Sequence, residues 1–294
     1  MISYCIPVFR PWFAKRLISD LIRKTSTAYE ILLWLNNVKD AELDAFLADV
    51  RAAGHPVRVV GRTPENIGMQ AFANLFREAR YDLITQIDDD VICVTPRIAE
   101  ICAETFARFP KVKQLVADCW RDEFTSGARP ARSSYRTFEA TCGLYDGPID
   151  GWFSVYHRSI LPVLIRSVPG YSIKIRGKRR FPWVHLRLCS PSRYFCMGAT
   201  VQSRLARRGE LGLLCTRFKV FHVTETHYVS YFNVIDFEIE KYRRVGRDDM
   251  VKHYEKRRST VAPREVLEAH VKQIEKELAT PIPSNSEGVF LCSP

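Results

Sequence analysis

Residues 84–93 read ITQIDDDVIC and join a short apolar run to three consecutive aspartates, Asp88, Asp89 and Asp90. The apolar run predicts a buried strand. Adjacent carboxylates at the end of such a strand repel one another, and each raises the pKa of its neighbours unless a cation or hydrogen-bond donors are present. If the backbone stays extended, Asp88 and Asp90 lie on one side and can share a divalent ion. The alternative is an acidic turn that caps the next helix.

The chain before this stretch alternates apolar strands, at 2–9, 29–35 and 56–60, with amphipathic helices, at 13–22, 43–50 and 66–79. This alternation predicts right-handed βαβ crossovers and an α/β fold with a mostly parallel central sheet covered by helices on both faces. Ligands of such sheets bind beyond the carboxyl ends of the strands. The segments that follow the predicted strands, at 7–10, 36–37, 61–68 and 88–90, all fall at those ends.

The chain after this stretch continues the pattern less regularly. We expect helices at 98–106, from 159 and at 200–208, and strands at 112–116, 153–156, 211–215 and 218–223. Residues 121–150 are polar and turn-rich and receive no assignment. Charged helices are expected over 230–260 and an amphipathic helix over 267–278, followed by a disordered tail.

Composition excludes several classes of protein. The 294 residues contain no run of about 18 apolar residues, which argues against a membrane-spanning helix. The first residues lack a signal-peptide core, so we expect a cytoplasmic protein. The nine cysteines form no CxxC pair and mostly lie in apolar stretches, which favours buried free thiols over disulfides or a zinc site.

The positive charge of the chain is concentrated in residues 166–208. This segment holds eleven of the 44 Lys and Arg residues and no Asp or Glu. In the rest of the chain, 33 Lys and Arg residues are balanced by 33 Asp and Glu residues. Aromatic residues interleave with the cations, as phosphate contact and base stacking require. We therefore predict a polyanion-binding surface made of Arg176, Lys178, Arg179, Arg180, Trp183 and Arg193, with Trp152 beside it. Anionic lipid headgroups and an ordinary solvated surface are the alternatives.

Several motifs together resemble the family 2 glycosyltransferases of the GT-A fold, over roughly residues 2–225. They are CIPVFRP (5–11), EILLWLNN (30–37), ENIGMQAFANLFREA (65–79), QIDDDV (86–91) and VFHV (220–223). The resemblance implies a UDP- or GDP-sugar donor bound by Pro7, Phe9, Arg10, Asn36, Asn37, Arg62, Asn66, Gly68, Asp88 and Asp89. It also implies a Mn²⁺ or Mg²⁺ ion held by Asp88, Asp90 and His222. For Asn66 and Gly68 a plain helix cap and turn is an equal alternative.

The sequence departs from this family at the expected catalytic base. Family members usually carry an acidic residue just before the Arg-rich helix, where this chain reads Gly198, Ala199 and Thr200. Asp150 is the nearest substitute, because a carboxylate beside an aromatic residue can have a raised pKa suited to a base. A turn aspartate is an equally good interpretation of Asp150.

The sequence thus predicts a metal-dependent glycosyltransferase for a polyanionic acceptor. The acceptor favoured is a hydroxymethylated base in DNA, which some GT-A relatives glycosylate. A cell-surface glycan or lipid-linked acceptor, with peripheral membrane contact, is the first alternative. A nucleic-acid-binding protein on a degenerate transferase scaffold is the second. We expect a GT-A-like domain over 1–229, with a donor half (1–120) and an acceptor half (121–229), a helical extension over 230–279, and a tail over 280–294.

Overall fold

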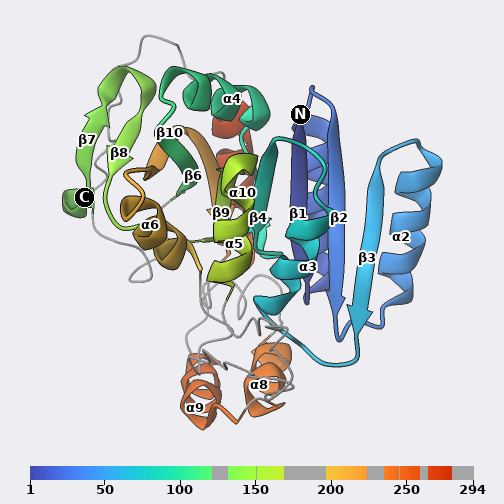
Figure 1. The fold of residues 1–294 in the computed structure, drawn as a ribbon. Coiled ribbons are helices and arrows are strands. Elements are labelled where there is room, and N and C mark those ends of the chain that lie inside the picture. Colours follow the sequence, from blue (N-terminus) through green and yellow to red (C-terminus); the bar gives the residue numbers. More distant parts are fainter. Residues whose placement is uncertain are drawn as a thin grey trace, which may run out of the picture.

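A computed structural model describes residues 1–120, 132–149, 151–168, 197–223, 235–244, 246–258 and 264–279. In these residues, ten strands form one sheet in the order β3-β2-β1-β4-β9-β6-β10-β8-β7, with β5 paired to β10 (Figure 1). The strands are β1 (Ile2–Val8), β2 (Tyr29–Asn36), β3 (Val57–Thr63), β4 (Leu83–Ile87), β5 (Val91–Ile92), β6 (Val112–Cys119), β7 (Arg136–Glu139), β8 (Leu144–Asp146), β9 (Phe153–His157) and β10 (Leu211–His222).

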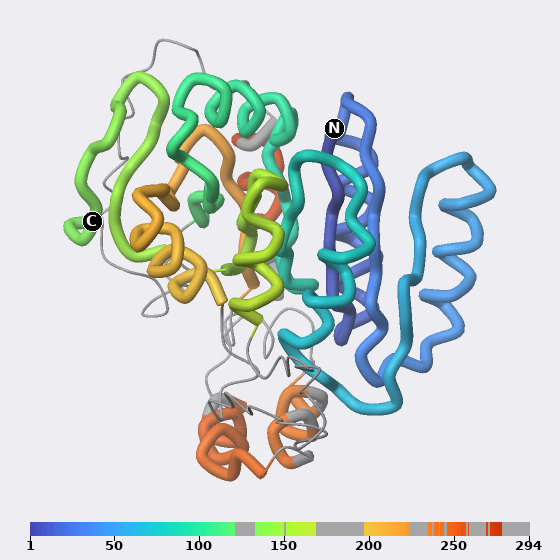
Figure 2. Tube along the Cα trace, in the orientation of Figure 1, coloured from blue at the N-terminus to red at the C-terminus, as the bar shows by residue number. Residues whose placement is uncertain are grey.

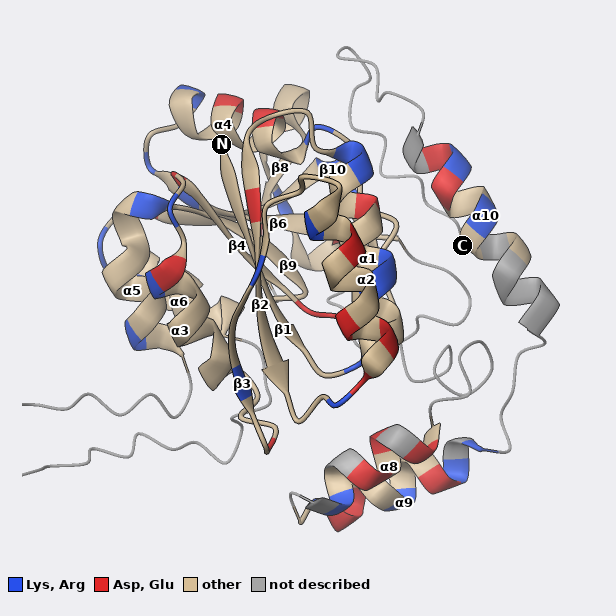
Figure 3. Ribbon diagram, turned by 90° about the vertical axis from the view of Figure 1, so that its right-hand side faces the viewer, with Lys and Arg blue, Asp and Glu red and all other residues tan. Residues whose placement is uncertain are grey.

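Helices cover both faces of the sheet. On one face α1 (Pro11–Lys24), α2 (Ala41–Ala52) and α4 (Ile98–Arg108) share a hydrophobic cluster with the strands. On the other face α3 (Gln70–Glu78), α5 (Leu161–Ser167) and α6 (Gly198–Ala206) form a second cluster. Figure 3 shows α3, α5 and α6 on the side of the sheet opposite to α1 and α2. The predicted α/β architecture is therefore confirmed.

The first half of the chain folds as the hydrophobic pattern predicts. Strands β1, β2, β3 and β4 are parallel, because each is followed by a helix that returns the chain to the same end of the sheet. Pro11 begins α1, where its missing N–H costs nothing. The Asp40 carboxylate accepts a hydrogen bond from the Leu43 N–H at 2.7 Å and so caps α2.

The second half has three features that the hydrophobic pattern did not predict. Strand β9 runs antiparallel between β4 and β6 and joins the two halves of the sheet. Figure 2 traces these halves by colour, with the N-terminal strands in blue and β10 in orange. One strand, β10, spans the two short strands expected at 211–215 and 218–223. Its register shifts between Cys215 and Lys219, so an irregularity absorbs the polar interruption without ending the strand. The unassigned stretch contains the antiparallel pair β7 and β8.

The C-terminal part of the chain is helical, as expected, in α8 (Ile235–Arg244), α9 (Asp248–Arg257) and α10 (Arg264–Ala279). Buried residues of these helices share a third cluster with Phe13, Ile92 and Phe221. The extension therefore packs against the end of the sheet. Among the described residues, no helix is long and apolar enough to span a membrane.

Six cysteines lie in the described residues, and all six are buried thiols rather than disulfides: Cys5, Cys93, Cys102, Cys119, Cys142 and Cys215. Burial raises the pKa of Cys215 to about 11 and that of Cys93 to about 12. The prediction of buried thiols rather than disulfides is confirmed for these six. Cys189, Cys196 and Cys292 lie outside the described residues.

Candidate active site

The three aspartates form the turn between β4 and β5. The Asp88 N–H donates to the Trp152 carbonyl at 3.0 Å, and the Asp88 carbonyl accepts from the Val91 N–H at 3.2 Å. The backbone is thus turned at the triplet, so the condition of an extended backbone, under which Asp88 and Asp90 were placed on one side, is not met. Asp88 and Asp90 can still share an ion, because the turn itself brings their side chains together.

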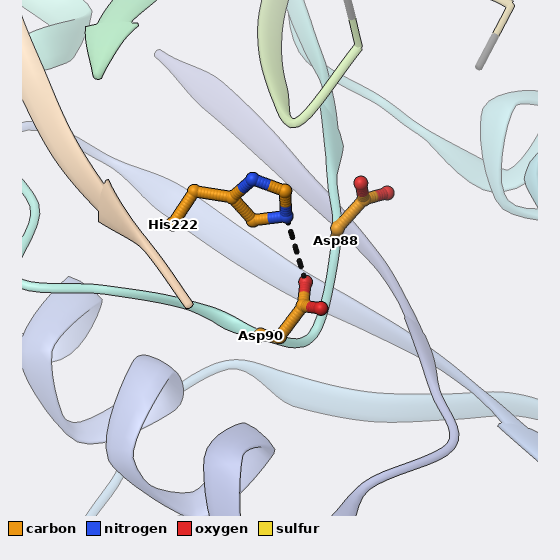
Figure 4. A group of neighbouring side chains, drawn as sticks. All are labelled: Asp88, Asp90 and His222. Atoms are coloured by element: carbon orange, nitrogen blue, oxygen red, sulfur yellow. Dashed lines mark ion pairs between the residues drawn. The ribbon is translucent and has the colours of Figure 1, made fainter. Parts of the chain in front are cut away.

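Asp88, Asp90 and His222 form a group that can hold a metal ion (Figure 4). One possible ligand atom from each residue lies within 4.8 Å of the others. His222 Nε2 is 3.3 Å from Asp90 Oδ1. Two carboxylates and one imidazole form a donor set suited to Mn²⁺ or Mg²⁺. The residues present therefore fit the predicted metal.

Strand pairing places His222 at this site although it follows the aspartates by more than 130 positions. The end of β10 pairs antiparallel with β5, with His222 opposite Val91. The Val223 N–H then donates to the Asp90 carbonyl at 3.0 Å. The short strand β5, which the sequence did not predict, is thus the element that joins the two parts of the metal site.

Trp152 forms one wall of the metal site. Its ring stacks on His222, with centroids 6.3 Å apart and planes inclined by 24°. Its Nε1 donates to the Ala117 carbonyl at 2.9 Å, and only 5% of the residue is exposed. The sequence assigned Trp152 to acceptor binding, but burial leaves its ring little surface for an acceptor. Its contacts instead fix the orientation of the imidazole.

Asp89 holds the end of β1. Its Oδ2 accepts hydrogen bonds from the N–H groups of Phe9 and Arg10, each at 2.6 Å, and its Oδ1 accepts one from Arg10 Nη1 at 2.5 Å. Burial raises the pKa of Asp89, an effect that Asp90 increases and Arg10 opposes. Asp89 therefore positions the segment after β1 at the aspartate turn.

A pocket of about 190 Å³ opens at the carboxyl ends of β1, β2 and β4. Most of the predicted donor-binding residues line it. The lining consists of Pro7, Phe9, Arg10, Asn36, Asn66, Gly68, Met69, Asp88, Asp89, Asp90 and Tyr242. The predicted position beyond the strand ends is therefore the position of the pocket.

Asn66 and Gly68 form the turn that was one of the two alternatives, and both also line the pocket. The Asn66 side chain accepts a hydrogen bond from the Gly68 N–H at 2.8 Å and so closes a turn just before α3. Gly68 has a φ of 56°, a left-handed conformation that glycine adopts without strain. Because both residues also line the pocket, the turn shapes its wall.

Two predicted donor-binding residues do not line the pocket. Arg62 pairs with Asp44 at 2.6 Å, and both side chains are about half exposed. Asn37 follows β2 in a left-handed conformation, with a φ of 55°. Conversely, Met69 and Tyr242 line the pocket without having been predicted. The sequence offered no signal for Tyr242, which lies in a charged helix far from the other motifs.

Other predicted site residues lie outside the described residues. They are the proposed base Asp150 and the polyanion-binding residues Arg176, Lys178, Arg179, Arg180, Trp183 and Arg193. Helix α6 has no acidic residue in its first turn, in line with its sequence.

No protein-family model matches the chain, and a search of curated proteins finds no match. Solved structures do match. Residues 1–349 of S. aureus TarS, in complex with UDP-GlcNAc, align with a TM-score of 0.50 at 10% identity, over 87% of this chain and 72% of that one. The mannosyltransferase PcManGT from Pyrobaculum calidifontis, in complex with GDP-Man and Mn²⁺, aligns with a TM-score of 0.47 at 14% identity, over 86% and 68%. A longer TarS structure is matched over 39% of its length.

The alignment with the UDP-GlcNAc complex of TarS defines the class of fold. The chain has the mixed α/β fold of GT-A-type glycosyltransferases, with a mostly parallel central sheet. This assignment of the fold rests on the UDP-GlcNAc complex of TarS, which aligns with a TM-score of 0.50. At 10% identity the likeness establishes the fold alone.

Proposed function

We propose that the protein is a metal-dependent glycosyltransferase that uses a nucleotide-sugar donor. The observation that carries this proposal is the group of Asp88, Asp90 and His222 beside a pocket at the strand ends. The TarS structure with this fold is a complex with UDP-GlcNAc, which supports the same class of donor here. A UDP- or GDP-sugar is therefore the expected substrate.

The chemistry of sugar transfer explains why these residues would be needed. Cleavage of the bond between a sugar and a diphosphate leaves negative charge on the departing group, and a bound divalent ion supplies charge to neutralise it. Asp88, Asp90 and His222 would hold this ion. The imidazole favours Mn²⁺ over Mg²⁺. Trp152 and Ala117 keep the imidazole oriented, and Arg10 offsets part of the charge of Asp89 and Asp90.

Asp150 remains our candidate for the base that takes the proton of the acceptor hydroxyl. Its support is its place in the sequence, two residues before Trp152, whose ring stacks on His222. The first turn of α6, where relatives carry an acidic residue, offers none. A carboxylate at Asp150 would supply the missing group.

For the acceptor we propose a polyanion, and most specifically a hydroxymethylated base in DNA. The support is the sequence of residues 166–208, with eleven cations, interleaved aromatics and no acidic residue. A base within a duplex would have to be flipped out or met in an open strand to reach the pocket. A surface glycan or lipid-linked acceptor would use the same donor site.

A donor screen tests the enzymatic proposal. The full chain is incubated with UDP- and GDP-sugars, with Mn²⁺, with Mg²⁺ or with EDTA, and with DNA that does or does not contain hydroxymethylated bases. We expect transfer or hydrolysis of one donor in Mn²⁺ and none in EDTA, detected by the mass of the products. Absence of turnover and of donor-induced thermal stabilisation with both metals would contradict the proposal and favour a nucleic-acid-binding protein on this scaffold.

Charge neutralisation tests the acceptor proposal. We expect replacement of Lys178, Arg179 and Arg180 by Gln to weaken DNA binding and to lower the slope of log K against log salt concentration by about one for each phosphate that is no longer neutralised. The matched control replaces three Arg residues with exposed side chains elsewhere, Arg23, Arg58 and Arg136. Fluorescence anisotropy at several salt concentrations measures both quantities. If the two triple variants bind DNA equally well, the proposal of a nucleic-acid acceptor is contradicted.

A further inference from the structure

Helix α8 of the C-terminal extension reaches the donor pocket. Tyr242 lines the pocket together with residues that follow β1, β2 and β4. Glu238, one helical turn earlier, is fully buried and accepts a hydrogen bond from Arg10 Nε at 2.7 Å. Residues four positions apart share a face of a helix. One face of α8 therefore meets both the pocket and the segment that follows β1.

Arg10 links this helix to the aspartate turn. Its Nε contacts Glu238, while its Nη1 is 2.5 Å from Asp89 Oδ1 and 3.3 Å from Asp90 Oδ2. A buried carboxylate such as Glu238 is costly unless a positive group compensates it. The pairing with Arg10 supplies that compensation, and it ties the position of α8 to the residues beside the metal group.

The ring of Tyr242 is also held by an aromatic contact. It stacks on Tyr254 of α9, with centroids 5.5 Å apart and planes inclined by 22°. Tyr254 is 3% exposed and belongs to the cluster that includes Ile239 of α8 and Phe221 of β10. Packing of this kind presents an aromatic side chain to a ligand in a fixed orientation, which lowers the entropic cost of binding.

We propose that Tyr242 binds the nucleotide of the donor and that Glu238 is a positioning residue, which holds α8 at the pocket through Arg10. This inference rests on the proposed function. A metal held by Asp88, Asp90 and His222 would lie at the diphosphate, which joins the nucleoside to the sugar, so the lining away from the metal group would face the nucleoside or the sugar. An aromatic ring in that lining can pack against a nucleobase or ribose. The C-terminal extension is then part of the donor site.

Binding of UDP and of GDP, each with Mn²⁺ and measured by calorimetry on the full chain, tests the role of Tyr242. Tyr242→Ala is expected to raise the Kd of the nucleotide on the order of 10-fold, whereas Tyr242→Phe, which keeps the ring, stays within about threefold. Binding of Mn²⁺ alone is expected to be unchanged in both variants. The matched control is Tyr81→Ala, because Tyr81 lies at the opposite end of the sheet, where its N–H donates to Ser3.

The role of Glu238 is tested in the same assay. Glu238→Ala is expected to raise the Kd of the same nucleotide several-fold, and Glu238→Gln, which can still accept from Arg10 Nε, is expected to restore part of the affinity. A purely structural role would lower the melting temperature and leave the Kd of the folded protein unchanged. That result would overturn the positioning role.

The two proposals fail in different ways. If the wild-type chain binds neither UDP nor GDP in the presence of Mn²⁺, the proposed function itself is contradicted. If the wild-type chain binds one of them and Tyr242→Ala binds it equally well, the function stands and the assignment of Tyr242 is overturned. Loss of Mn²⁺ binding in Tyr242→Ala would also overturn the assignment, since the substitution would then act on the metal group.

Discussion

Asp90→Asn is expected to reduce donor turnover by at least about 100-fold, because removal of a direct metal ligand should cost no less than the loss of the groups that orient such ligands. The substitution keeps the shape of the side chain and removes its charge. Asp90 is 5% exposed, and His222 Nε2 lies 3.3 Å from its Oδ1. The loss should therefore appear as weaker Mn²⁺ binding, measured by calorimetry, together with lower turnover in saturating donor.

Asp44→Asn provides the control for this experiment. Asp44 is also an aspartate paired with an arginine, Arg62, but its side chain is 49% exposed and lies outside the pocket. Wild-type turnover is expected in this variant. If Asp90→Asn binds Mn²⁺ and turns over donor as the wild type does, Asp90 is not a metal ligand and the proposed mechanism fails.

Phe153→Ala is expected to lower the free energy of unfolding by about 3–5 kcal/mol. Phe153 is fully buried in β9, opposite Ile87 of β4, and its ring meets the edge of Phe218 with centroids 6.0 Å apart. Truncation removes the ring from the core where the two halves of the sheet join, and it leaves a cavity that the neighbouring strands cannot fill. Urea unfolding followed by circular dichroism measures the change.

Phe138→Ala is the matched control for Phe153→Ala. Phe138 lies in β7 at the edge of the sheet and is 41% exposed. Its truncation removes far less buried surface, so we expect a cost clearly below that of Phe153→Ala. Equal destabilisation in the two variants would mean that β9 does not hold the halves of the sheet together.

The sequence predicted the first half of the fold well, because that half depends on local patterns. Apolar strands and amphipathic helices alternate up to Ile87, and their crossovers connect parallel strands of one sheet. In the second half, β9 lies antiparallel between β4 and β6, which precede it by very different numbers of residues in the sequence. No local periodicity encodes such pairing, so the join between the halves could not be predicted.

The candidate site shows the same division. The aspartates could be found because three carboxylates at a strand end carry a chemical signal of their own, whereas His222 was found through the resemblance of residues 220–223 to a known family. Glu238 and Tyr242 lie in a charged amphipathic helix whose pattern is that of many surface helices. Their place beside Arg10 and the pocket depends on long-range packing alone.

The position of β9 in the sheet has a consequence for synthesis of the chain. Strand β4 pairs with β1 along one edge, and its other edge receives its partner only when Phe153–His157 has been made. Strand β5 gains its partner later still, when Phe221 and His222 of β10 have been made. During translation the N-terminal strands therefore expose an unpaired and mostly apolar edge strand, the kind of surface that invites aggregation and chaperone binding. Because His222 arrives with the last of these strands, the metal group forms only after nearly the whole sheet has been synthesised.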